Sequence, residues 1–141
     1  MRGTIRTFNE DMRDDIHERI TTLSEAVAKG SRASCRVCIT KNYPVTINDP
    51  ALTEAMLPTL QRVGGAGQVV NVPKITGSED FSFFQRVVPG LFVFLGVTAP
   101  GVDPKTAAPN HSPRFTVDEA ALVTGVRMLA HLACDWLEAK R

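Results

Sequence analysis

The sequence predicts an α/β protein in which amphipathic helices alternate with short β-strands. Apolar residues recur at helical spacing over residues 10–29 and 117–138, and a residue able to cap a helix stands before each stretch. Residues 2–8 alternate small or β-branched side chains with arginines, and residues 33–40 alternate apolar and polar ones, as half-buried strands do. Residues 91–95 (LFVFL) are continuously apolar, which is typical of a central strand covered on both faces.

The first half of the chain reads as strand, helix, strand and helix. Asn9 is placed to cap the helix over residues 10–29, and Lys29-Gly30 ends it. A second helix is expected from about residue 50, because Asn48-Asp49 can cap it and Pro50 suits its first position. We expect that helix to end at Gly64-Gly65 and to kink or divide at Pro58.

The second half predicts two further strands and two further helices. Strands are expected over residues 68–72 and 91–95, with a short helix between them that Ser78 can cap. The closing helix is expected over about 117–138, with Thr116 and Glu119 as a capping box. Its apolar stripe comprises Ala120, Val123, Val126, Ala130, Ala133 and Leu137.

Composition excludes several classes of partner. The chain has 141 residues, enough for one domain or two small ones, with 16 basic and 15 acidic residues and no basic cluster. Neither a nucleic acid nor a membrane is therefore expected as a partner. The run over residues 87–97 is too short to cross a bilayer, and no apolar signal core opens the chain, so we expect a soluble, cytoplasmic protein.

Two polar turns carry the candidate site residues. His111 lies in the turn Pro109-Asn110-His111-Ser112-Pro113, where the two prolines restrict the backbone, and neutral imidazole is the commonest protein ligand for metals. The second turn contains Gly77, Ser78, Glu79 and Asp80, whose acids either stabilise the start of a helix or support a metal site. Loops that follow the strands of an open sheet usually build its site, so we expect both turns to form part of one site.

The cysteines and the other histidines are less informative. Cys35 and Cys38 have the spacing of redox and zinc motifs, but an offset of three on a strand points their sulfurs to opposite faces. His17 and His131 are expected on solvated helix faces.

Five blocks of sequence carry a resemblance to a known family. GTIRTF, NYPVTIND, GSEDFSFF, PGLFVFLG and NHSPRFTVDEAAL, in this order, resemble the C-terminal part of metal-dependent amidohydrolases and peptidases. This family includes hippurate hydrolase, N-acyl-amino-acid amidohydrolases and plant auxin-conjugate hydrolases. The resemblance implies that residues 1–46 are the second half of a ferredoxin-like lid (β-α-β) that mediates dimerisation. Residues 47–141 would be the C-terminal part of an α/β catalytic domain with a central mixed sheet.

The resemblance also implies roles for the two turns. His111 matches the family's last metal ligand, which holds one ion of a divalent pair (Zn, Mn, Co or Ni) that acts on the amide of an N-acyl amino acid. Glu79 and Asp80 would support catalysis, and Gly77, Ser78 and Asn110 would contact substrate. The family's other metal ligands and its general base have no counterpart here, so the chain alone is expected to be inactive and to hold no metal stably.

Two other classes of function stay open from the sequence. The chain could be a non-catalytic α+β interaction module whose β-α-β segment pairs edge to edge with itself or a partner. A redox or zinc protein that uses Cys35 and Cys38 is the third reading.

Overall fold

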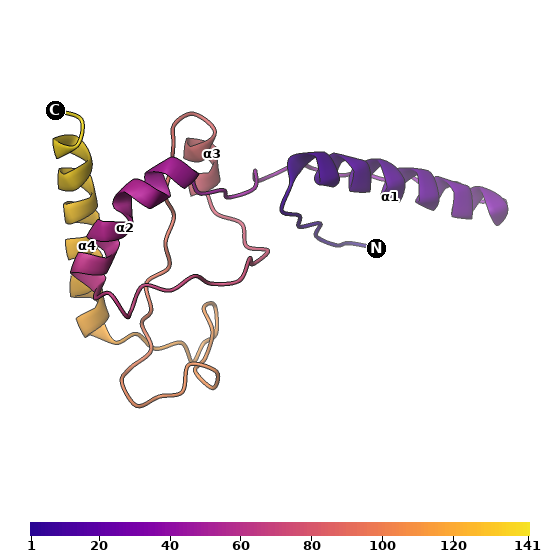
Figure 1. The fold of residues 1–141 in the computed structure, drawn as a ribbon. Coiled ribbons are helices and arrows are strands. Elements are labelled where there is room, and N and C mark those ends of the chain that lie inside the picture. Colours follow the sequence, from indigo (N-terminus) through magenta and orange to yellow (C-terminus); the bar gives the residue numbers. More distant parts are fainter. The chain divides into compact units, whose positions relative to one another are not determined.

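The structure, a computed structural model, describes residues 1–141 and contains four α-helices and no β-strand (Figure 1). The chain divides into two compact units. The first unit comprises Met1–Asn48 and Pro73–Gly90, with helices α1 (Glu10–Gly30) and α3 (Phe81–Gln85). The second comprises Asp49–Val72 and Leu91–Arg141, with α2 (Pro50–Gly64) and α4 (Glu119–Glu138).

The starts of the first two helices are those that the sequence predicts. The Asn9 side chain accepts a hydrogen bond from the Met12 backbone N–H at 3.0 Å, and Asp49 accepts one from Leu52 at 2.8 Å. Each carboxyl or amide oxygen satisfies one of the N–H groups that a helix leaves unpaired at its start. Pro58 lies inside α2, which continues past it, so of the two expected effects the helix shows no division, and a kink at Pro58 stays a prediction.

The other two helices begin differently from the prediction. The N-cap of α3 is Asp80, without a side-chain capping bond, and Ser78 does not cap it. The α4 helix is capped by Asp118, which accepts from the Ala120 N–H at 3.1 Å, and not by Thr116. Asp118 directly precedes the helix, so its short carboxylate reaches the first turn without the longer capping box.

The predicted α/β fold, with a partial ferredoxin-like lid and a central mixed sheet, is wrong for this chain. No backbone hydrogen bond joins any two of the four predicted strands, over residues 2–8, 33–40, 68–72 and 91–95. A strand is stable only when its N–H and C=O groups pair with a neighbouring strand, and these segments find no such neighbour in the chain. Alternation of apolar and polar residues favours an extended backbone, but it does not show whether another segment pairs with that backbone.

The segment predicted as a central strand is largely exposed. Val93, Phe94 and Leu95 are all exposed, whereas the prediction had both faces covered. The rings of Phe92 and Phe94 meet edge to face at a centroid distance of 5.3 Å, the side-by-side placement that alternate residues of an extended chain adopt. Leu95 reaches α4, because a Cβ at Gly125 would come within 2.9 Å of its Cδ2.

The core of the second unit lies where α2 packs against α4 (Figure 1). Met56 and Leu60 of α2 are the only buried apolar side chains of the chain. Met128 of α4 approaches α2 at Gly64, where a Cβ would lie 3.2 Å from its Cε. The predicted stripe of α4 instead stays exposed, because the helix turns a different face toward α2.

A polar cluster joins the same two helices. Asp135 of α4 accepts hydrogen bonds from the hydroxyl of buried Thr59 and from Arg62 Nη2, the latter at 2.6 Å. His131 Nδ1 lies 3.5 Å from Arg62 Nη1. The Thr59 hydroxyl and the Arg62 guanidinium hold the pKa of Asp135 below its ordinary 3.8. The charged form of Asp135 therefore stabilises the helix pair.

We expect the second unit to lose stability in acid because of this cluster. Because the pKa of Asp135 is lowered in the folded chain, its ionised form stabilises the unit at pH values above the ordinary pKa of 3.8. That contribution is lost as pH falls through the lower pKa of the folded state. Trp136, the single tryptophan, lies in α4, so its fluorescence follows unfolding of this unit. In Asp135→Asn the acid loss of stability should be smaller than in the parent chain; equal acid profiles would exclude Asp135 as the cause.

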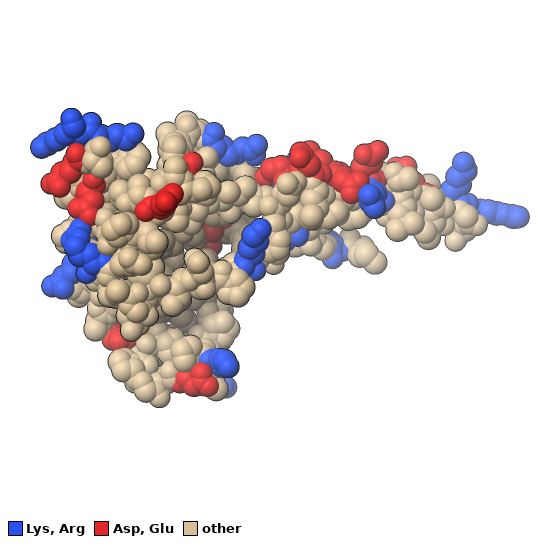
Figure 2. Space-filling model, in the orientation of Figure 1, with Lys and Arg blue, Asp and Glu red and all other residues tan.

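Polar contacts also organise the first unit around the start of α1. Glu10 pairs with Arg13 and accepts the Val45 N–H at 2.9 Å, while Arg13 donates to the Tyr43 carbonyl at 2.6 Å. These contacts hold residues 43–45 against the helix. Figure 2 shows acidic groups gathered over the earlier turns of α1 and basic groups at its far end, the order that the helix dipole favours.

Candidate functional site

The turn around His111 has a defined backbone. The Ser112 N–H donates to the Pro109 carbonyl at 3.1 Å and closes a four-residue turn, and the Ser112 hydroxyl accepts from the Arg114 N–H at 3.2 Å. His111 occupies the third position of this turn with φ 68°. That left-handed conformation costs an L-residue about 1–2 kcal/mol, and histidine adopts it more readily than most residues.

The imidazole of His111 is free to bind an external group. The residue is exposed, and its side chain takes part in no hydrogen bond or ion pair. Asn110, the predicted substrate contact, is exposed beside it in the sequence. The strained backbone holds a side chain that has no partner within the chain. This combination favours a function in which the side chain binds an external group.

The polar turn over residues 77–80 is held by an arginine from the opening segment. Arg6 Nη1 donates to the Thr76 carbonyl at 2.8 Å and to the Ser78 hydroxyl at 3.1 Å. Through this contact with Arg6, the Ser78 hydroxyl helps to hold the turn in place. A Cβ at Gly77 would meet only ordinary contacts, the nearer at 3.9 Å from Ile75, so this chain does not itself require a glycine there.

The two acids of this turn differ in their surroundings. Glu79 is half-buried, and its carbonyl accepts from the hydroxyl of fully buried Ser82 at 2.7 Å. Asp80 is exposed and accepts a hydrogen bond from the Tyr43 hydroxyl, which raises the pKa of Tyr43 above its ordinary 10.0. The Tyr43 ring also lies 5.7 Å from that of Phe83. Asp80 is thus oriented by a side chain that lies far from it in sequence.

Tyr43 offers a direct test of this contact, because it is the only tyrosine in the chain. Its phenolate absorbance should appear at higher pH than the ordinary 10.0, and Asp80→Asn should move the titration back down. The raised pKa means that the bond stabilises the first unit below pH 10.0 and that this contribution is lost as pH rises through the folded value. Glu79→Gln is the matched control and should leave the titration in place; an unshifted Asp80→Asn would remove the contact.

The two candidate turns belong to different compact units. Residues 77–80 lie in the first unit and His111 in the second. Their union in one site stays a prediction. No three histidine, cysteine, aspartate or glutamate residues lie close enough together to hold a metal ion, whereas a catalytic zinc takes about three protein ligands.

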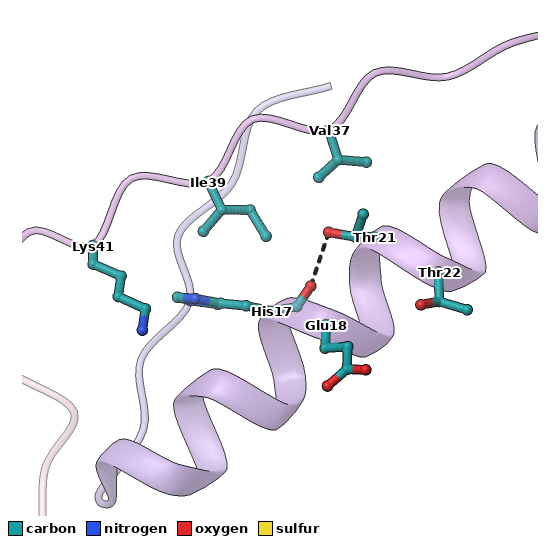
Figure 3. A pocket seen from close by; sticks show the side chains of 7 residues that line it. All are labelled: His17, Glu18, Thr21, Thr22, Val37, Ile39 and Lys41. Atoms are coloured by element: carbon teal, nitrogen blue, oxygen red, sulfur yellow. Dashed lines mark hydrogen bonds between the residues drawn. The ribbon is translucent and has the colours of Figure 1, made fainter.

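The cysteines and His17 lie elsewhere. Cys35 and Cys38 are free and exposed. His17 is half-buried and, with Val37, Ile39 and Lys41, lines an open hollow of about 380 Å³ between α1 and the segment that follows it (Figure 3). The Thr21 hydroxyl donates to the His17 carbonyl at its floor. His17 is therefore not on a fully solvated face as expected.

Comparison with known proteins identifies the family. The profile of the peptidase family M20/M25/M40 matches residues 7–135, nearly the whole chain. The chain belongs to this peptidase family. The resemblance inferred from the sequence is thereby confirmed, and the family is generally metal-dependent.

Individual relatives agree with this assignment. The chain is 30% identical to the putative amidohydrolase YhaA of Bacillus subtilis, over 95% of this chain and 33% of that protein. It is 31% identical to the N-acetylcysteine deacetylase of the same organism, over 98% of this chain and 34% of the relative. It is also 31% identical to the IAA-amino acid hydrolase ILR1-like 4 of Arabidopsis thaliana, over 96% of this chain and 31% of the relative. This peptidase-family chain thus spans about a third of the length of these relatives, and no solved structure matches it.

Sequence reasoning missed the side chains that orient the polar turn. Arg6 lies 72 positions from Ser78, and Tyr43 comes from the segment that precedes α2. The sequence blocks that contain them, GTIRTF and NYPVTIND, were among those that carried the family resemblance, and that was the available signal.

Proposed function

We propose that this chain forms the C-terminal part of a metal-dependent amidohydrolase that cleaves the amide bond of N-acyl amino acids. The observation that carries the proposal is the family match over residues 7–135. The relatives named N-acetylcysteine deacetylase and IAA-amino acid hydrolase support the choice of a small N-acyl amino acid as substrate.

His111 would supply one ligand to a divalent metal pair of Zn, Mn, Co or Ni. Its exposed imidazole, without an internal partner, fits that role. Such a pair, when bound, polarises the amide carbonyl and activates water. Because one imidazole cannot hold a catalytic metal, the remaining ligands and the general base must come from other polypeptide, and the chain alone is proposed to be inactive.

The turn over residues 77–80 would contact the substrate and orient groups around it. Asp80, held by Tyr43, and half-buried Glu79 are proposed to orient groups around the metal pair, while Gly77, Ser78 and Asn110 contact substrate. Arg6 fixes the position of Ser78 through its hydrogen bond of 3.1 Å. A charged contact of this kind is directional and therefore suits a positioning role.

The domain assignment is proposed along the same lines. Residues 1–46 would be the second half of a lid that pairs two copies of the enzyme, and residues 47–141 the closing part of the catalytic domain. A cytoplasmic location is proposed with this assignment, as for a soluble metabolic enzyme.

A chimera tests the activity. In the N-acetylcysteine deacetylase of Bacillus subtilis, the aligned 138 residues are replaced by this chain, and free amino acid released from a panel of N-acyl amino acids is measured. We expect metal-dependent hydrolysis by the chimera and none by the isolated chain. A folded, metal-loaded chimera without hydrolysis would contradict the proposal, and a stable dimer of the isolated chain would then favour the interaction module.

A further inference from the structure

The start of α1 and the acidic turn over residues 77–80 are joined through Tyr43. The backbone carbonyl of Tyr43 accepts a hydrogen bond from Arg13 Nη1 at 2.6 Å, and its hydroxyl donates to the Asp80 carboxylate. The Tyr43 ring lies 5.7 Å from the ring of Phe83, which belongs to α3, directly after the turn. Tyr43 is thus held at its backbone by α1 and contacts the acidic turn with its side chain.

Arg13 is the residue that holds the backbone of Tyr43. Its side chain is only 13% exposed, and its Nη2 forms an ion pair with Glu10, three residues earlier on α1. Its Nε is buried and has no hydrogen-bond partner in the chain. Buried donors are nearly always paired, and leaving one unpaired costs stability. The position of this guanidinium is therefore determined by its contacts with Glu10 and Tyr43.

The far end of α3 has anchors of its own. Arg86 Nη1 lies 3.9 Å from the Glu10 carboxylate, and the Gln85 side chain accepts a hydrogen bond from the Ile47 N–H at 3.1 Å. All of these residues belong to the first unit, as Arg13 and Asp80 do. Loss of the contact between Arg13 and Tyr43 would therefore act on the end of α3 that carries Asp80 and leave the other end held.

We infer that Arg13 is a positioning residue that acts on Asp80 through Tyr43. The inference rests on the proposed function, in which Asp80 orients groups around the metal pair. The planar guanidinium donates in fixed directions, so it holds the Tyr43 carbonyl and the Glu10 carboxylate in one arrangement. Without Arg13, Tyr43 keeps its ring but loses the anchor that holds its hydroxyl against Asp80. The exposed carboxylate of Asp80 is then free to rotate.

The titration of Tyr43 in the isolated chain tests this link without any activity. Arg13→Met keeps a long side chain and removes the donors. We expect the phenolate absorbance of Tyr43 to move down toward the ordinary pKa of 10.0, because the contact with Asp80 is the main cause of its raised pKa. Loss of a nearby cation would alone move the titration upward, since a positive charge favours the phenolate. Circular dichroism at each pH checks that the helices are retained.

Two further variants separate positioning from other effects of the change. Arg19→Met removes an arginine from the same helix, where it is exposed and pairs with Asp15 at 2.9 Å without contacting Tyr43. This control should leave the Tyr43 titration in place. Arg13→Lys keeps a charged donor for the Tyr43 carbonyl and should restore part of the upward shift.

The chimera then measures the effect on turnover. Arg13→Met is expected to lower kcat by about tenfold and to leave KM within about twofold of the parent value, as for a residue that orients another. Adding Arg13→Met to Asp80→Asn should cause no further loss, because both changes remove the same contact. A residue that only supports the fold would instead add its own loss to that of Asp80→Asn. Arg19→Met should keep the parent kcat.

The outcomes distinguish this inference from the proposed function. An unchanged or raised Tyr43 titration in Arg13→Met overturns the inference, whether or not the chimera is active. An active chimera in which Arg13→Met keeps the parent kcat, or adds its full loss to that of Asp80→Asn, overturns it as well. A lowered titration beside a folded, metal-loaded but inactive parent chimera supports the link from Arg13 to Asp80 and contradicts the proposed function alone.

Discussion

Replacing His111 by alanine in the chimera is expected to lower turnover by at least about 100-fold, together with its metal content. Changes to residues that only orient a ligand already cost about 10–100-fold, and loss of the ligand itself costs at least as much. The loss should persist in His111→Gly, although glycine relieves the strain of φ 68° and should raise stability by about 1 kcal/mol. Stability and turnover thus move in opposite directions in this variant.

The matched control for the first prediction is His131→Ala. His131 lies in the same unit and only approaches Arg62, so its removal should leave metal content and turnover close to those of the parent chimera. Equal losses from His111→Ala and His131→Ala would show that His111 acts only through folding. Unchanged metal content in His111→Ala would remove this residue from the site.

Replacing Leu60 by alanine is expected to destabilise the second unit by about 2–5 kcal/mol, the usual range for a buried leucine. Leu60 is 6% exposed, and Met56 is the only other buried apolar side chain, so the apolar part of the contact between α2 and α4 depends largely on these two residues. Small domains are stable by only about 5–15 kcal/mol, so a loss of this size is a large fraction of the free energy of unfolding. Urea unfolding followed by Trp136 fluorescence measures it.

Leu57→Ala is the control on the same helix. The substitution removes the same side-chain volume as Leu60→Ala, but Leu57 is 38% exposed. We therefore expect the free energy of unfolding to fall by about 1 kcal/mol or less. If both variants were equally unstable, the loss would come from helix propensity and not from the core between α2 and α4.

The helices could be predicted because their signals are local. Asn9 and Asp49 each stand a few residues from the N–H group that they cap, and Pro50 marks the first turn of α2. The apolar stripe of α4 was recognised as helical, but which face meets α2 depends on residues such as Thr59 and Asp135, which lie 76 positions apart. Periodicity predicts a helix and not its partner.

The absence of strands could not be predicted from the sequence. Strand pairing, like the choice of a helix's partner, depends on contacts between distant segments. Alternation in residues 33–40 favours an extended backbone, but pairing is a contact between distant segments, and the chain contains no partner for them. At the candidate site, the prolines around His111 predicted a restricted backbone, whereas the role of His111 as a metal ligand stays a prediction. Its left-handed backbone and the contacts of Arg6 and Tyr43 depend on the folded structure.

Nuclear magnetic resonance of the histidine rings during zinc titration tests most directly whether this chain supplies one ligand to a shared metal site. In the ¹⁵N-histidine chimera, the ring signal of His111, assigned with His111→Asn, should shift to a metal-bound position at stoichiometric zinc. The signals of His17 and His131 should stay in place, and the isolated chain should show no such shift at the same zinc concentration. A chimera that binds zinc and hydrolyses substrate while the His111 signal does not move would contradict the account.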